Sequence, residues 1–159
     1  MYGIDEIMAM LDWNNSSEVQ KRGIELAENI NNINVFLQPM NPGCNKNVWE
    51  NCAKMLAKKS DNILQPYLLH LLEWLEDINW PGAFIIIDRL KSFSGEALVD
   101  IFSHAVNLAK MDWYSEMWLD YLSGLLDNKE LRALLAPDVL NLLCKHYDNF
   151  WGNSIDLFR

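Results

Sequence analysis

Apolar residues recur at helical spacing along most of this chain. In the clearest stretch they stand three or four positions apart with polar residues between them, at Ile63, Leu64, Tyr67, Leu68, Leu71, Leu72 and Leu75. This spacing places the apolar side chains on one face of a helix and the polar side chains on another. The same spacing recurs in residues 98–109, 114–125 and 139–150. The pattern predicts an all-α fold.

Polar residues ahead of these stretches indicate where helices begin. Ser17-x-x-Gln20 fits a capping box, in which the first side chain accepts a hydrogen bond from the backbone at the start of the helix. Asn47-x-x-Glu50 is a looser match to the same motif. Pro66 suits only the first turn of a helix, so the regular helix there is predicted to begin near Leu64.

The segment Ala83-Phe84-Ile85-Ile86-Ile87 has the composition of a buried strand. However, Pro81 just ahead of it suits a helix N-terminus, and the chain continues through Asp88 to Lys91 without a turn signal. No other segment offers a strand to pair with it. We therefore predict a helix that is buried on nearly all sides.

The longest irregular stretch spans residues 31–46 and contains Pro39, Pro42 and Gly43. Loops of this length are usually functional or mobile. A short helical turn is expected to pin this one to the core through its apolar residues, which are Ile33, Val35, Phe36 and Leu37.

Five of the seven tryptophans recur at intervals of 31 to 38 residues, at Trp13, Trp49, Trp80, Trp113 and Trp151. Trp13, Trp80 and Trp113 stand next to Asp or Asn where one amphipathic stretch ends and the next begins. There the polar residue can cap the second helix, while the indole fills the wedge between neighbouring helix pairs. We expect the first four indoles in the core, and Trp151 at the close of the last helix. Such a period is typical of α-solenoids.

At this point the chain resembles HEAT and armadillo-like helical repeats. Over roughly residues 63–93 it is similar to a motif of small uncharacterised bacterial HEAT-like proteins, read here as Leu64-Gln65-Pro66-Tyr67-Leu68 through Leu72-Glu73-Trp74-Leu75-Glu76-Asp77-Ile78-Asn79-Trp80-Pro81-Gly82. The resemblance implies an α–α superhelix (HEAT/ARM-like) of about four to five irregular helix pairs. It also implies a binding scaffold, and some similar proteins act as immunity proteins against toxins. No catalytic residue carries over, because the motif has none.

The length of 159 residues suits a single helical-repeat domain over residues 1–159, and 50% of the residues are hydrophobic, which is enough for a core. Lys and Arg number 13 against 22 Asp and Glu, so the net charge is −9. This charge repels phosphate backbones and anionic membranes. We therefore expect no direct nucleic-acid binding and no membrane binding.

The cysteines Cys44, Cys52 and Cys144 have no close C-x-x-C spacing, so we expect reduced thiols in a cytoplasmic protein. Cys52 and Cys144 stand on apolar stretches and are predicted to lie in the core. The first residues lack the features of a signal peptide, and no apolar run is long enough to span a membrane.

Potential metal ligands stand near one helix face at His70, Glu73 and Asp77. A metal site needs three or four converging ligands, whereas His104 and His146 are distant in sequence and have no Cys or carboxylate at i+3 or i+4. Neither a nucleophile motif nor a Gly-rich phosphate loop is present. We expect no catalytic residue, no metal site and no cofactor.

The remaining candidates are acidic residues and two tryptophans at the edges of apolar stripes, namely Trp74, Glu73, Glu76, Asp77, Trp118, Glu116 and Asp120. Partly exposed aromatic side chains anchor interfaces, and acidic residues steer a basic partner. We predict a non-enzymatic protein-binding scaffold, with an immunity or inhibitor protein against a basic toxin nuclease as its specific version. The alternatives are a small hydrolase or metal-dependent enzyme whose site assembles only in the fold, and a homo-oligomeric module.

Overall fold

The computed structural model describes residues 2–39, 45–111 and 115–154. Every regular element in these ranges is a helix, which confirms the predicted all-α fold. The α-helices are α1 (Ile4–Met10), α2 (Ser17–Glu28), α3 (Trp49–Ala57), α4 (Asp61–Leu64), α5 (Leu68–Glu73), α6 (Ala83–Lys91), α7 (Gly95–Met111), α8 (Ser115–Ser123), α9 (Lys129–Leu134) and α10 (Pro137–Ser154). Short 3₁₀ turns join them at η1 (Asn34–Phe36), η2 (Lys46–Val48), η3 (Gln65–Tyr67), η4 (Trp74–Glu76) and η5 (Gly124–Asp127).

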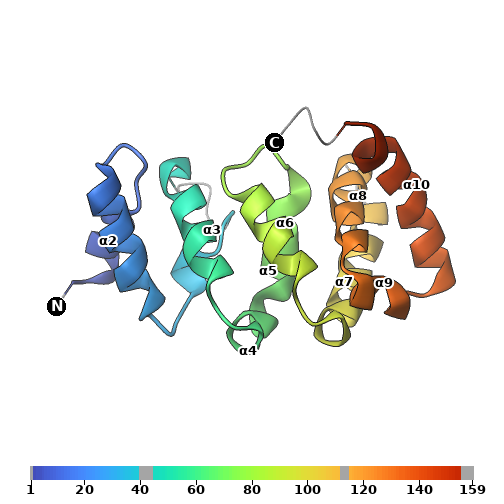
Figure 1. The fold of residues 1–159 in the computed structure, drawn as a ribbon, viewed down its shortest axis with the longest axis horizontal. Coiled ribbons are helices and arrows are strands. Elements are labelled where there is room, and N and C mark those ends of the chain that lie inside the picture. Colours follow the sequence, from blue (N-terminus) through green and yellow to red (C-terminus); the bar gives the residue numbers. More distant parts are fainter. Residues whose placement is uncertain (1, 40–44, 112–114, 155–159) are drawn as a thin grey trace.

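The helices form a row, with α2 near one end and α10 at the other (Figure 1). In the first half, α1 packs on α2, α2 packs on α3, and α3 packs on α6. In the second half, α5 packs on α7, α7 packs on α8 and α9, and α8 packs on α10. Most contacts therefore join elements close together in the sequence, and the molecule is elongated along the row.

One hydrophobic core runs through the row, from Ile7 in α1 to Trp151 in α10. Its largest fully buried side chains include Phe36, Trp74 and Phe102. Burying an apolar side chain of this size stabilises the fold by about 1.5–3 kcal/mol. The amphipathic stretches of the sequence thus meet along a continuous apolar seam.

The apolar segment that begins at Ala83 is helix α6, as predicted. It packs on α3, η4 and η5, and it buries Ala83, Ile86, Ile87 and Leu90. Gly82 precedes it with a left-handed φ of 85°, and a Cβ on this residue would lie 2.6 Å from the Cβ of Ala53. Glycine is therefore required where α6 approaches α3.

Two predicted helix starts differ from the structure. The cap of α2 is Ser16 rather than Ser17, because the Oγ of Ser16 accepts the hydrogen bond from the backbone N–H of Val19. Asn47 does not cap a helix, because it lies inside η2 and α3 begins two residues later. The side chain of Asn45 instead accepts from the backbone N–H of Asn47, so the turn begins before the predicted cap.

Pro66 lies in the first turn of η3, as its ring requires, but not in the first turn of the helical run as a whole. Helix α4 begins at Asp61, and the chain stays helical through η3, which contains Pro66, into α5. A 3₁₀ turn accommodates the proline because proline has no N–H to donate. The helix was predicted to begin near Leu64, and it begins about one turn earlier, at Asp61.

The irregular stretch before α3 is pinned as predicted for the residues that the structure describes. Ile33, Phe36 and Leu37 are fully buried, and η1 supplies the short helical turn. Val35 was expected to help but is exposed. Pro42, Gly43 and Cys44 lie outside the described residues.

The tryptophans occupy different environments. Trp49 and Trp151 are buried and Trp80 is half-buried, whereas Trp13 has 43% of its surface exposed. The expectation that Trp13 lies in the core is therefore wrong. It lies in the turn between α1 and α2, the first two helices of the chain. Trp113 lies outside the described residues.

No helix among residues 2–39, 45–111 and 115–154 combines the length and the apolar character needed to cross a bilayer. Cys52 is fully buried, as predicted. Cys144 was also expected in the core, but it is half-buried and packs against the edge of the core.

Candidate partner-binding surface

The two tryptophans predicted to anchor a partner are buried in the protein. Trp74 is 0% exposed, and its indole N–H donates to the backbone oxygen of Pro81 at 3.0 Å. Trp118 is 8% exposed, and its indole N–H donates to the backbone oxygen of Leu72 at 3.0 Å. Their predicted exposure is therefore wrong, because neighbouring elements of the row cover the edges of the apolar stripes.

The five predicted acidic residues lie on α5, η4 and α8 or directly beside them. Glu76 and Glu116 are exposed, while Glu73, Asp77 and Asp120 are half-buried. Glu73 lies 3.6 Å from the Nδ1 of His70 on the same helix. Glu116 and Asp120 are one turn apart on α8, and α8 packs on η4. The structure thus places carboxylates from two separate segments of the sequence near one another.

Tyr121 lies within electrostatic reach of two of these carboxylates. Burial of its phenol raises its pKa, and the negative charges of Asp77 and Asp120 raise it further. Asp77 directly follows η4, whereas Asp120 lies on α8 next to Tyr121. Two carboxylates from distant segments therefore act on the same phenol. We call Asp77, Glu116 and Asp120 the acidic patch.

His146 on α10 joins this patch from a third element. Its Nδ1 lies 2.7 Å from the Oδ1 of Asp120, and both side chains are more than two-thirds buried. The indole N–H of Trp151 donates to the backbone oxygen of Asp120 at 2.7 Å. Local spacing gives no sign of this pair, because no carboxylate stands three or four residues after His146 and Asp120 is 26 residues away in the sequence.

A metal or catalytic role was not predicted for these side chains. Among residues 2–39, 45–111 and 115–154, no group of three or more His, Cys, Asp or Glu is placed to hold a metal ion. A nucleophilic tyrosine needs a lowered pKa, but that of Tyr121 is raised by burial and by the two carboxylates. The arrangement therefore keeps the phenol protonated and holds negative charge at the surface.

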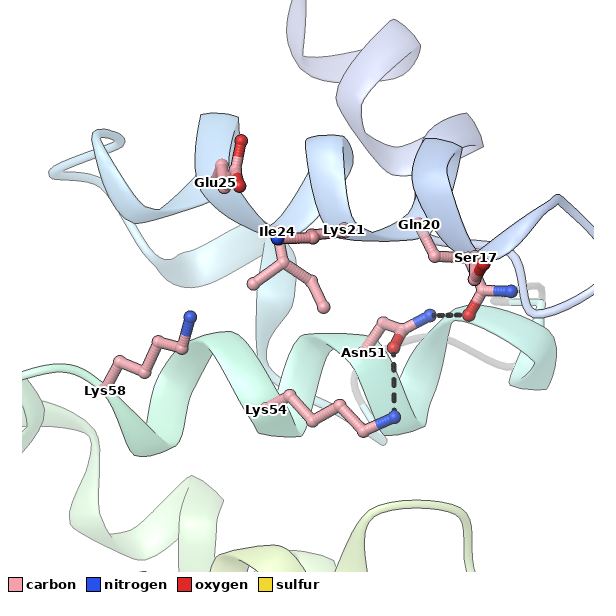
Figure 2. A pocket seen from close by; sticks show the side chains of 8 residues that line it. All are labelled: Ser17, Gln20, Lys21, Ile24, Glu25, Asn51, Lys54 and Lys58. Carbon is pink, nitrogen blue, oxygen red and sulfur yellow. Dashed lines mark hydrogen bonds between the residues drawn. The ribbon is translucent and has the colours of Figure 1, made fainter.

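A groove that no local sequence pattern predicts lies between α2 and α3 (Figure 2). It has a volume of about 290 Å³ and is lined by Ser17, Gln20, Lys21, Ile24, Glu25, Asn51, Lys54 and Lys58. Figure 2 shows Asn51 between the two helices, with its amide donating to Gln20 and its oxygen accepting from Lys54. The groove could have been found only from the packing of α2 on α3.

The charges beside this groove are largely balanced. Lys54 pairs with Glu50 at 2.8 Å, and Lys58 pairs with Glu28 of α2. Lys21 has no ion-pair partner in the part of the chain that the structure describes, while Glu25 pairs with Arg22 at 3.6 Å. The groove has mixed charge, and it differs in this from the acidic patch.

Comparison with protein families gives one match. The model of a family described as a domain of unknown function (DUF5071) matches residues 49–129, from the start of α3 into α9. No curated protein and no solved structure matches the chain. The matched residues include the whole acidic patch, whereas α1, α2 and α10 lie outside them.

Proposed function

We propose that this chain, which belongs to the DUF5071 family, is a non-enzymatic scaffold that binds a basic protein through its acidic patch. The observation that carries the proposal is the packing of α8 on η4, which brings Asp120 and Asp77 close enough for both charges to act on Tyr121. Acidic side chains gathered on one side of a protein attract a cationic partner and repel an anionic one. Glu116, exposed one turn before Asp120, extends the same charge toward solvent.

The proposal includes a repeat architecture. We interpret the row of helices as an α–α superhelix of irregular HEAT-like pairs, in which each pair packs on the next. The packing of α3 on α6 and of α5 on α7 supports this interpretation. Such an arrangement presents a broad side to a protein partner rather than a deep pocket.

Charge supplies both the selectivity and the rate of the proposed association. The net charge of −9 attracts basic proteins from a distance. The acidic patch is the proposed binding site for the partner that this attraction brings to the surface. With Trp74 and Trp118 buried, the anchors must come from other side chains. In its specific version the scaffold is an immunity or inhibitor protein, working in the cytoplasm, and its partner is a basic toxin nuclease.

Affinity capture from the source cell tests the proposal. The wild-type protein and the variant Asp77→Asn/Glu116→Gln serve as baits at about 50 mM and about 500 mM salt. We expect basic proteins on the wild type at low salt, and their loss both at high salt and with the variant. Glu18→Gln/Asp138→Asn is the matched control, because it also removes two carboxylates and both are exposed. Retention of the same partner by both baits at high salt would contradict the proposal.

The close pair of His146 and Asp120 favours a hydrolase as the second candidate. A carboxylate on one ring nitrogen orients a histidine as a general base in many hydrolases. The second candidate requires that His146→Gln abolish hydrolysis of a generic ester such as p-nitrophenyl acetate. Our proposal predicts equal background hydrolysis by the wild type and the variant.

A further inference from the structure

An apolar groove separates the start of α5 from the first half of α7. It has a volume of about 340 Å³ and is lined by Gln65, Pro66, Leu68, Leu69, Ala97, Asp100 and Ile101. The lining includes one charged side chain, the carboxylate of Asp100, which is exposed. Both walls lie inside the residues that the family model matches, unlike the groove between α2 and α3.

The groove continues along α7 as a narrow stripe that is apolar except for the exposed imidazole of His104. Ala97, Ile101, His104, Leu108 and Met111 stand at i, i+4, i+7, i+11 and i+14, and at 100° per residue they fall on one line of the helix. The first two are half-buried in the groove, and Leu108 and Met111 are 37% and 85% exposed. At a rise of about 1.5 Å per residue, the stripe is about 21 Å long.

We propose that the α5–α7 groove and the α7 stripe together hold one amphipathic helix of a basic partner. Spacing of i, i+4, i+7 and i+11 is the pattern by which one helix packs along another. A stripe of about 21 Å matches a helix of about fourteen residues. This inference rests on the proposed function, and it names the segment of the partner that would supply the apolar contacts.

Charge decides the chemistry of the occupant. Glu96 and Asp100 are exposed on α7 beside the groove, and neither has an ion-pair partner among the described residues. Lys110 lies at the other end of the helix, so the negative charge is concentrated at the groove. A helix with Lys or Arg flanking its apolar face would satisfy these carboxylates, whereas an acidic helix would be repelled.

Synthetic peptides of about fifteen residues test this inference by fluorescence anisotropy. The first has Leu on one face and Lys elsewhere, the second has the same composition with Leu spread around the helix, and the third has Glu in place of Lys. We expect the first peptide to bind about tenfold more tightly than the second, and the third not to bind. Equal binding of the first two peptides, or no binding of the first, would overturn the inference.

Two protein variants locate the binding site. Leu108→Asn/Met111→Asn removes apolar surface from the stripe, and Ala97→Gln fills part of the groove. Each is expected to weaken binding of the first peptide about tenfold. Val19→Asn/Leu134→Asn removes two side chains of 39% and 49% exposure elsewhere, and it should bind like the wild type.

The acidic-patch variant Asp77→Asn/Glu116→Gln separates the two proposals. If this variant weakens binding of the first peptide and the stripe variants do not, then the peptide does not dock on α7. In that case the inference is wrong while the proposed function stands. If neither variant weakens binding of the first peptide, the inference fails, and the capture experiment alone decides the proposed function. Weakening by the stripe variants is the result that supports the inference.

Discussion

Three buried indoles use their N–H groups to join separate segments of the row. Trp74 donates to Pro81, Trp118 donates to Leu72, and Trp151 donates to Asp120, each at a backbone oxygen. A buried indole needs such a partner, because an unsatisfied N–H is costly away from water. These residues thus hold the scaffold together from inside, and they are not available to a partner.

Trp74→Phe tests this structural role. The substitution keeps an aromatic ring but leaves the backbone oxygen of Pro81 without its donor. We expect a loss of about 1–3 kcal/mol in the free energy of unfolding, measured with denaturant, and unchanged binding of the basic partner. The control Trp13→Phe, at a residue that is 43% exposed, should change the free energy of unfolding by less than about 0.5 kcal/mol. Weakened binding by folded Trp74→Phe would indicate that the ring contacts the partner.

Gly82→Ala is expected to destabilise the fold by at least about 2 kcal/mol. Its φ of 85° is unfavourable for alanine, and the added Cβ would lie 2.6 Å from the Cβ of Ala53. Gly152→Ala in α10 is the matched control, because its Cβ would meet nothing closer than the backbone oxygen of Tyr147 at 3.9 Å. We expect that control to stabilise the protein by about 0.5–1 kcal/mol. Equal effects of the two substitutions in thermal unfolding would contradict this account.

At the scale of elements, Asp61 at the start of α4 ties three segments together. Its carboxylate accepts from the guanidinium of Arg89 on α6 at 2.5 Å and from the backbone N–H of Ser94 at 3.0 Å. Burial acts to raise the pKa of Asp61, but these hydrogen bonds and the charge of Arg89 outweigh it, so the pKa is lowered from 3.8. The charged carboxylate therefore stabilises the fold.

This contribution has a defined pH dependence. Because the pKa of Asp61 is lower in the folded protein than its ordinary value of 3.8, the stabilisation is fully present above that pH and is lost as the pH falls through the folded pKa. Asp61→Asn should cost about 1 kcal/mol at pH 7, since solvent screens a side chain that is 37% exposed. The difference from wild type in denaturant unfolding should shrink as the pH falls below 3.8. If Asp61→Asn lowers the free energy of unfolding by the same amount at every pH, the charged carboxylate is not the source of the stabilisation.

Much of the element order could be predicted from the sequence, because apolar spacing is a local property. Helices α7 and α10 follow directly from it, and so does α6, once no partner strand was found. The packing of elements that are distant in the sequence could not be predicted from it. The edge position of Trp118 on its helix gave no sign that Leu72 would accept from it, 46 residues away.

The same limit applies to the candidate surface. The acidic residues could be chosen from the sequence, but their convergence on Tyr121 depends on how α8 packs on η4. The pairing of His146 with Asp120 depends on α10 in the same way. The local sequence pattern therefore identified the acidic residues, but only the packing of the helices brings them together.

At the scale of the whole molecule, the row of helices predicts an extended shape in solution. A compact globule of this length would have a radius of gyration of about 15 Å. Small-angle X-ray scattering of the full chain should give a larger value, because the contacts run along the row (Figure 1). A value at or below about 15 Å would show that the helices close into a compact bundle.

The central claim is that negative charge on this scaffold holds a basic protein. The most direct measurement is the dissociation constant of the captured partner as a function of salt concentration, for the wild type and for Asp77→Asn/Glu116→Gln. We predict a steep loss of affinity with salt for the wild type, and weaker binding with a shallower salt dependence for the variant. A dissociation constant that is the same at all salt concentrations and in both proteins would contradict the claim.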